Sequence, residues 1–178
     1  NMSDFLTTQK TRLVYKGRDI HLRGVNLGGW LMMEGYILHA PNQPEQFFKS
    51  RFKEKLGPEA LLEFEEGFRR SFIREEDFRL ISDWGLNCIR LPFNCRLVDH
   101  PGSEGVRYLD EAVLWAKRYG LWLILDLHAA WGAQNPDWHS DSSGAAELWR
   151  SPGDQKRTLD LWAFLAERYR NEPSVAGY

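Results

Sequence analysis

Hydrophobic and polar residues along this chain form blocks that predict β-strands and α-helices in turn. The clearest block runs from Leu121 to His128, where a nearly unbroken apolar stretch ends in Asp126 and His128. Apolar runs of this length are typical of parallel strands that are buried on both faces. Similar blocks predict strands near residues 24–27, 86–93, 121–128 and 175–178.

The segments between these strands carry apolar residues at helical spacing. The predicted helices are two segments within residues 43–72 separated at Gly57-Pro58, one from Arg74 to Gly85, one from Leu109 to Tyr119, and one opening at Ser151-Pro152. The apolar face of the last helix is expected to contain Leu159, Trp162, Ala163 and Ala166. Strands and helices that alternate at this spacing form right-handed βαβ units, so we expect an α/β fold with a parallel sheet.

A short β-hairpin at about residues 12–22 is expected before the first parallel strand. Its two apolar triplets flank the turn-forming segment from Lys16 to Asp19. At the other end, the last predicted strand has only four residues. We therefore expect three full parallel strands and the beginning of a fourth, as one part of a larger fold.

Composition excludes several classes of protein. With 23 Lys and Arg against 25 Asp and Glu, the chain resembles neither a nucleic-acid-binding protein nor a polybasic membrane-surface protein. No apolar run reaches membrane-spanning length, and the N-terminus lacks the pattern of a signal peptide. We expect a cytoplasmic protein, or a secreted one if a leader has been removed. Cys88 and Cys95 flank one strand, beyond disulfide reach, and are expected to be reduced.

Ionisable residues stand near the carboxyl ends of two neighbouring predicted strands. Arg90 is near the end of one, and Asp126 and His128 close the next, on the same face because they are two residues apart. Since α/β proteins place functional groups at these strand ends, the three side chains could share one polar cluster. The cluster could orient a carboxylate or a substrate hydroxyl, or it could be an Arg–Asp pair that only satisfies itself. The spacing leaves both interpretations open.

Four motifs in this chain carry a family resemblance. They are, in order, Arg23-Gly24-Val25-Asn26-Leu27-Gly28-Gly29-Trp30-Leu31, Ile89-Arg90-Leu91-Pro92, Leu125-Asp126-Leu127-His128 and Gly132-Ala133-Gln134-Asn135. Together they resemble glycoside hydrolase family 5, most closely the branch that contains exo-β-1,3-glucanases. The resemblance implies a (β/α)₈ TIM barrel and hydrolysis of β-glycosidic bonds with retention. Residues 1–178 would then be a single incomplete barrel domain, its N-terminal part, with about three and a half barrel strands.

The same resemblance implies roles for individual residues. Arg90 matches the arginine that hydrogen-bonds the nucleophilic glutamate, and His128 matches a histidine lining the sugar subsite next to the cleaved bond. Glu34 matches a glutamate that binds sugar hydroxyls, and Asn135 and Trp138 are candidate cleft residues. The implied partner is a β-linked oligosaccharide, a β-glucan or a β-glucoside.

The resemblance also implies two catalytic glutamates, and the acid/base belongs to an Asn-Glu-Pro motif after the fourth barrel strand. The chain contains Asn171-Glu172-Pro173, but this motif precedes the last predicted strand and so belongs at the opposite end of the barrel. Both glutamates are therefore expected beyond residue 178. Because retaining hydrolysis needs an acid/base and a nucleophile, residues 1–178 alone are predicted to be inactive.

Two other functions fit parts of the sequence. A non-catalytic carbohydrate-binding or assembly module could reuse half of a barrel. A metal-dependent hydrolase could draw its ligands from Asp126, His128, Asp137, His139 and Asp141, although their spacing is loose for a metal site. We favour the glycosidase, without a metal or cofactor, and with the remaining C-terminal part of the barrel as a candidate partner.

Overall fold

The protein is described here by a computed structural model, which covers residues 4–178 and contains two sheets. The first sheet is antiparallel, in the order β1 (Thr7–Gln9), β2 (Arg12–Tyr15) and β3 (Arg18–Ile20). β2 and β3 form the hairpin that the sequence predicts. β1 was not predicted, because its three residues are all exposed and show no apolar alternation.

The second sheet has four parallel strands, and each lies where the sequence predicts one. They are β4 (Gly24–Asn26), β5 (Cys88–Asn94), β6 (Trp122–Ala129) and β7 (Val175–Gly177). Their order in the sheet is their order in the chain, and every neighbouring pair is parallel. Helices connect the strands, so the chain follows the winding of a (β/α) barrel over part of its circumference.

Five α-helices connect or flank the parallel strands. They are α1 (Glu45–Leu56), α2 (Pro58–Phe72), α3 (Glu75–Asp83), α4 (Glu104–Tyr119) and α5 (Pro152–Tyr169). α4 begins at Glu104 instead of Leu109, because its first turn contains a glycine and charged residues that conceal the helical pattern. Within residues 4–178, no helix combines the length and apolarity that crossing a bilayer requires.

The face of α5 that packs on the sheet differs from the predicted one. Leu159 is 69% exposed, and Ala163 and Ala166 are also exposed, so of the predicted residues only Trp162 packs against the core. The buried face instead carries Leu161, Leu165 and Tyr169. The helix has apolar residues on two sides, and contact with the sheet, not periodicity, decides which side is buried.

Within residues 4–178, one face of β6 is mostly buried and the other is half-buried; in a (β/α) barrel this second face points to the barrel interior. Leu125 is fully buried in the core, while Ile124, Asp126 and His128 on the opposite face are half-buried. Ile124 and Asp126 line an open cavity of about 340 Å³ that also contacts Tyr178. This second face carries the ionisable residues at the end of the strand.

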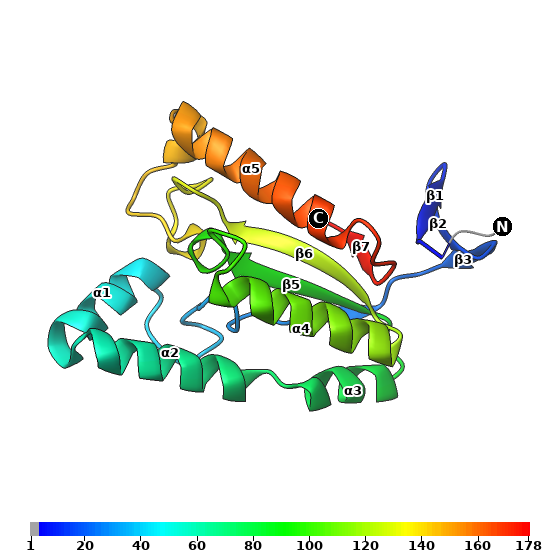
Figure 1. Cartoon of the computed structure of the whole chain (residues 1–178), viewed down its shortest axis with the longest axis horizontal. Coiled ribbons are helices and arrows are strands. Elements are labelled where there is room, and N and C mark those ends of the chain that lie inside the picture. Colours follow the sequence, from blue (N-terminus) through cyan, green and yellow to red (C-terminus); the bar gives the residue numbers. More distant parts are fainter. Residues whose placement is uncertain (1–3) are drawn as a thin grey trace.

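The carboxyl ends of β5 and β6 point to one end of the molecule, where α1 and the loop between β6 and α5 also lie (Figure 1). The antiparallel sheet lies at the other end (Figure 1). There, the rings of Tyr15 and Trp122 meet edge to face with centroids 5.5 Å apart, and Asn87 Nδ2 donates to the carbonyl of His21. The antiparallel sheet thus lies on the side of the amino ends of the parallel strands and contacts β6 through Tyr15.

Cys88 and Cys95 stand at the two ends of β5, and both are free and buried. This agrees with the expected reduced thiols. Burial raises the pKa of the Cys95 thiol to about 12, so the group stays protonated at neutral pH.

Candidate active site

Arg90, Asp126 and His128 come together at the carboxyl ends of β5 and β6, as the sequence predicts. Arg90 is in register with Ile124, so Asp126 lies one step further along the same face of β6. The Oδ2 atom of Asp126 is 2.6 Å from Nη2 of Arg90 and 2.9 Å from Nδ1 of His128. Parallel pairing of two strands is therefore enough to assemble this polar cluster.

Glu34 joins the cluster from the loop that follows β4. Its side chain is 6% exposed, and Oε1 lies 3.5 Å from Nε2 of His128. The loop stays close to the sheet, because the backbone N–H of Leu27 donates to the carbonyl of Arg90. A Cβ atom at Gly28 would lie 2.5 Å from Cδ1 of Ile37 in the same loop, so the Ile37 side chain would have to change its rotamer.

His128 lies between two carboxylates and is held as an imidazolium. Hydrogen bonding to Asp126, and then to Glu34, raises the pKa of His128 to about 9. Both ring nitrogens therefore carry protons at neutral pH. The cluster holds two cationic groups and two carboxylates at the carboxyl ends of the strands. Such a set can donate hydrogen bonds to sugar hydroxyls and accept hydrogen bonds from them.

Asn135 and Trp138 belong to the loop after β6 and lie in the same neighbourhood. Asn135 Oδ1 accepts from the backbone N–H of Asp137, and its Nδ2 lies 3.3 Å from Nε2 of His139, so its side chain shapes the loop. Trp138, in the short helix η2 (Trp138–Ser140), packs edge to face against Tyr36. His139 links this loop to the cluster, because its ring centroid is 6.2 Å from that of His128.

Gln134 hydrogen-bonds the loop after β6 to the end of that strand. The motif Gly132-Ala133-Gln134-Asn135 gave no indication of this role. Its Nε2 donates to the carbonyl of His128 at 2.6 Å, and its Oε1 accepts from the backbone N–H of Ala130 at 3.1 Å. Trp131 turns inward and is buried, with the Arg157 guanidinium 3.4 Å above its ring centroid. Trp131 therefore packs inside the loop and does not offer its ring to a sugar in the cleft.

A second polar network, which the sequence did not predict, joins the end of β5 and the start of α1 to the loop after β6. Asn94 Nδ2 is 3.2 Å from Glu45 Oε2 and 3.0 Å from Asp141 Oδ2, and all three residues are buried. The carboxylate of Glu45 is 2.5 Å from Lys49 Nζ, one helical turn further along α1. The i,i+4 spacing of Glu45 and Lys49 was the one feature of the sequence that pointed to this network. It did not distinguish the pair from those on any exposed helix.

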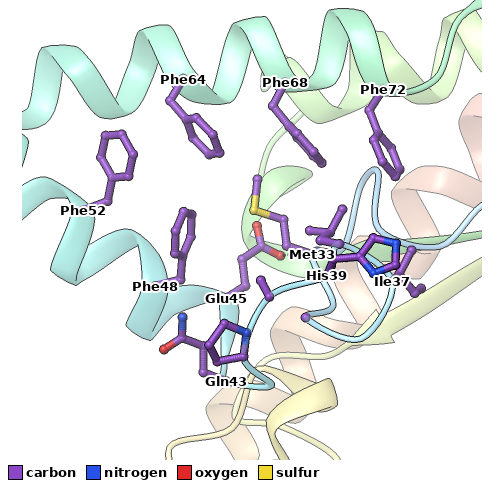
Figure 2. A pocket seen from close by; sticks show the side chains of 14 residues that line it. Met33, Ile37, His39, Gln43, Glu45, Phe48, Phe52, Phe64, Phe68 and Phe72 are labelled. Carbon is purple, nitrogen blue, oxygen red and sulfur yellow. Dashed lines mark hydrogen bonds between the residues drawn. The ribbon is translucent and has the colours of Figure 1, made fainter.

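A separate apolar cavity of about 580 Å³ lies between α1, α2 and the loop around His39 (Figure 2). Phenylalanines one turn apart line its walls: Phe48, Phe52, Phe64, Phe68 and Phe72. Figure 2 shows their rings projecting from both helices toward the space between them. None of the cluster residues lines this cavity, so we do not assign it to the candidate active site.

The metal hypothesis finds no support in the geometry. The carboxylate of Asp141 is bound by the backbone N–H of Gln46, by Asn94 and by Arg96, away from a shared centre. Among residues 4–178, no three His, Cys, Asp or Glu side chains form a group that could hold a metal ion.

Glu172 lies at the end of the sheet opposite the cluster. It precedes β7, and its carboxylate pairs with Lys117 Nζ at 3.1 Å, near the end of α4. The amino ends of the strands are at this side. The location therefore agrees with the prediction that Glu172 belongs to the opposite end of the barrel.

A parallel sheet wound in chain order, with a polar cluster at its carboxyl ends, defines the class of (β/α)-barrel proteins. Within that class, this chain belongs to glycosyl hydrolase family 5: residues 52–178 match the family model Cellulase (glycosyl hydrolase family 5). The family indicated by the four motifs is thus confirmed.

Individual relatives match most of this chain. A β-xylosidase of Phanerodontia chrysosporium is 36% identical over 182 residues, which span 98% of this chain and 38% of that protein. Glucan 1,3-beta-glucosidase 1 of Schizosaccharomyces pombe is 35% identical, over 83% of this chain and 39% of that protein. The chain therefore spans less than half the length of these curated relatives.

The fold agrees with solved structures as well. The crystal structure of a rutinosidase from Aspergillus niger superposes with a TM-score of 0.65 at 20% identity. The match covers 87% of this chain and 46% of that one. At this level of identity the likeness concerns the fold, and it confirms a partial barrel.

Proposed function

We propose that this chain is the N-terminal part of an enzyme that hydrolyses β-glycosidic bonds with retention of configuration. Its substrates would be β-glucans, β-linked oligosaccharides or β-glucosides. Membership of glycosyl hydrolase family 5 supports this proposal, as do the relatives named β-xylosidase and glucan 1,3-beta-glucosidase. The observation that carries it is the cluster of Arg90, Asp126, His128 and Glu34 at the carboxyl ends of the strands.

Each cluster residue has a role suited to this chemistry. Arg90 is a fixed donor that would hold the nucleophilic carboxylate, because a guanidinium matches carboxylate geometry. His128 would donate to a sugar hydroxyl, and Glu34 would accept from one. Asn135 and Trp138 would border the cleft, with the Trp138 ring beside Tyr36 as an apolar surface for a sugar ring.

Both catalytic glutamates are placed beyond residue 178 in this proposal. Retaining hydrolysis requires two carboxyl groups about 5 Å apart, one as acid/base and one as nucleophile. The carboxylates in the cluster are already engaged, Asp126 by Arg90 and Glu34 by His128. Residues 1–178 would therefore bind and orient the sugar, and the remainder of the barrel would supply the cleavage.

The test compares residues 1–178 with the complete polypeptide that contains them, using 4-nitrophenyl β-glucoside and short β-1,3-glucans. We expect hydrolysis by the complete polypeptide alone, with the β-anomer as the first product in proton NMR. Turnover by residues 1–178 would place the catalytic groups inside this chain. An α-anomer as first product would overturn retention, and sugar binding without hydrolysis would favour the non-catalytic module.

The kcat/KM values of single-residue variants test whether the cluster at the strand ends takes part in hydrolysis. His128→Gln in the complete polypeptide should lower kcat/KM roughly 100-fold, as the loss of one positioned donor commonly does. The matched control is His100→Gln, at an exposed histidine beside Asp99. Equal effects of the two substitutions would contradict the placement of His128 in the sugar subsite.

A further inference from the structure

Asp126 stands between two cationic groups that are almost in contact. Nη2 of Arg90 and Nδ1 of His128 are 3.4 Å apart, and the Oδ2 atom of Asp126 lies within 2.9 Å of both. Two positive groups at this distance repel each other, and an anion between them offsets this repulsion by attracting both. The side chain of Asp126 is 23% exposed, so water screens this arrangement only in part.

We propose that Asp126 is a positioning residue: its carboxylate fixes the orientations of Arg90 and His128 and keeps the imidazole of His128 doubly protonated. This inference rests on the proposed function, because Arg90 and His128 matter there as donors to the substrate and to the nucleophile. Asp126 itself need not touch the substrate. The alternative, a self-satisfied Arg–Asp pair, would leave the protonation of His128 independent of Asp126.

The groups that face His128 come from four elements. Asp126 is on its own strand, Arg90 is on β5, Glu34 is in the loop after β4, and His139 is in η2. Arg90 disfavours the imidazolium, and the two carboxylates favour it. Since Asp126 makes the shorter contact with the ring, 2.9 Å against 3.5 Å for Glu34, it is the main partner.

The geometry also decides which proton remains after the ring loses one. Oδ2 of Asp126 accepts a hydrogen bond from the N–H at Nδ1, so a neutral His128 would keep its one proton on Nδ1 and leave Nε2 unprotonated. Nε2 is the atom that faces Glu34. With only one proton, His128 would change from donor to acceptor at that atom.

The decisive variant is Asp126→Asn, measured in the complete polypeptide. By NMR, we expect the pKa of His128 to be clearly lower in this variant than in the unchanged protein, because the largest of the contacts that raise it is lost. Hydrolysis should lose kcat/KM at pH values above the lowered pKa of His128, where Nε2 no longer donates a hydrogen bond. Asp126→Glu, which keeps a carboxylate, should restore part of both values. Asp83→Asn is the control, because that exposed carboxylate pairs with Arg79 on α3.

Each outcome separates this inference from the proposed function. An unchanged pKa of His128 in Asp126→Asn would overturn the inference, and so would a lowered pKa with no loss of kcat/KM above it. A lowered pKa in a polypeptide that hydrolyses no glycoside would overturn the proposed function instead. If Asp126→Asn does not fold, nitrogen-15 shifts of the unchanged protein above pH 9 decide: a proton remaining on Nε2 would contradict the role of Asp126.

Discussion

The backbone N–H of Gln46 donates a hydrogen bond of 2.8 Å to Oδ1 of Asp141, joining the first turn of α1 to the loop after β6 across 95 residues of sequence. The other carboxylate oxygen accepts from Asn94 at the end of β5 and from Arg96. One buried side chain thus links three separate segments beside the candidate active site. The loop that carries Asn135 and Trp138 depends on this link for its position.

Replacing Asp141 should therefore lower the free energy of unfolding, by more with alanine than with asparagine. Asp141→Ala leaves Gln46 N–H and Arg96 Nε without this acceptor, leaves Asn94 Nδ2 with Glu45 alone, and places alanine at a left-handed φ of 55°, so we expect a loss of roughly 3–5 kcal/mol in the free energy of unfolding. Asp141→Asn keeps the shape and tolerates that φ, and should cost about 1–2 kcal/mol. Urea unfolding measures both. The exposed Asp137→Ala is the control, and a cost of Asp141→Ala no larger than this control's would contradict the linking role.

The stability of the protein should decline in alkaline solution because of His128. Its pKa is about 9 when folded against 6.5 ordinarily, so the folded state binds the proton more tightly. This contribution is fully present below pH 6.5 and is lost as the pH rises through about 9. The full difference corresponds to roughly 1–3 kcal/mol. Urea unfolding between pH 6 and 10 measures it, and His128→Gln should flatten this part of the profile; an equally steep decline in that variant would refute the assignment.

Gly24 allows β4 to approach β5 closely, and a larger residue should separate them. A Cβ atom there would lie 2.0 Å from the carbonyl oxygen of Cys88, which is backbone and cannot rotate away. We expect Gly24→Ala to destabilise the fold by roughly 2–4 kcal/mol. Gly67→Ala, in a helix with nothing within 4 Å, should stabilise by about 0.5–1 kcal/mol. Thermal unfolding of the two variants tests this contrast, and a neutral Gly24→Ala would show that the strands can separate freely.

Cys95 should be inert in the folded protein. Burial raises its pKa to about 12, so almost no thiolate is present at pH 8, and the sulfur is shielded from reagents. Alkylation by iodoacetamide at pH 8 should be roughly 100-fold slower than in urea. Cys88 is also buried and should behave in the same way. Mass spectrometry of the labelled peptides gives both rates, and rapid native labelling of Cys95 would show that the end of β5 opens readily.

Much of the fold and part of the site follow from local sequence patterns. β5 and β6 lie where apolar blocks predict them, because such blocks are stable when buried in a sheet, while β4 and β7 are short and only partly buried. Asp126 and His128 share a face because they are two residues apart, and Arg90 meets them because parallel pairing aligns neighbouring strand ends. The buried face of α5 was misassigned, since Leu159 and Leu161 both fit an apolar stripe and only one can face the sheet.

The sequence by itself determined the order of strands and helices, the family and the strand-borne part of the cluster, because these depend on local periodicity and short motifs. Tertiary structure alone decided that Glu34 faces His128, that Asp141 binds Gln46, and that Asn135 shapes its own loop. These contacts depend on the paths of long loops between distant elements. Such paths result from packing of the whole chain, and no local pattern of residues specifies them.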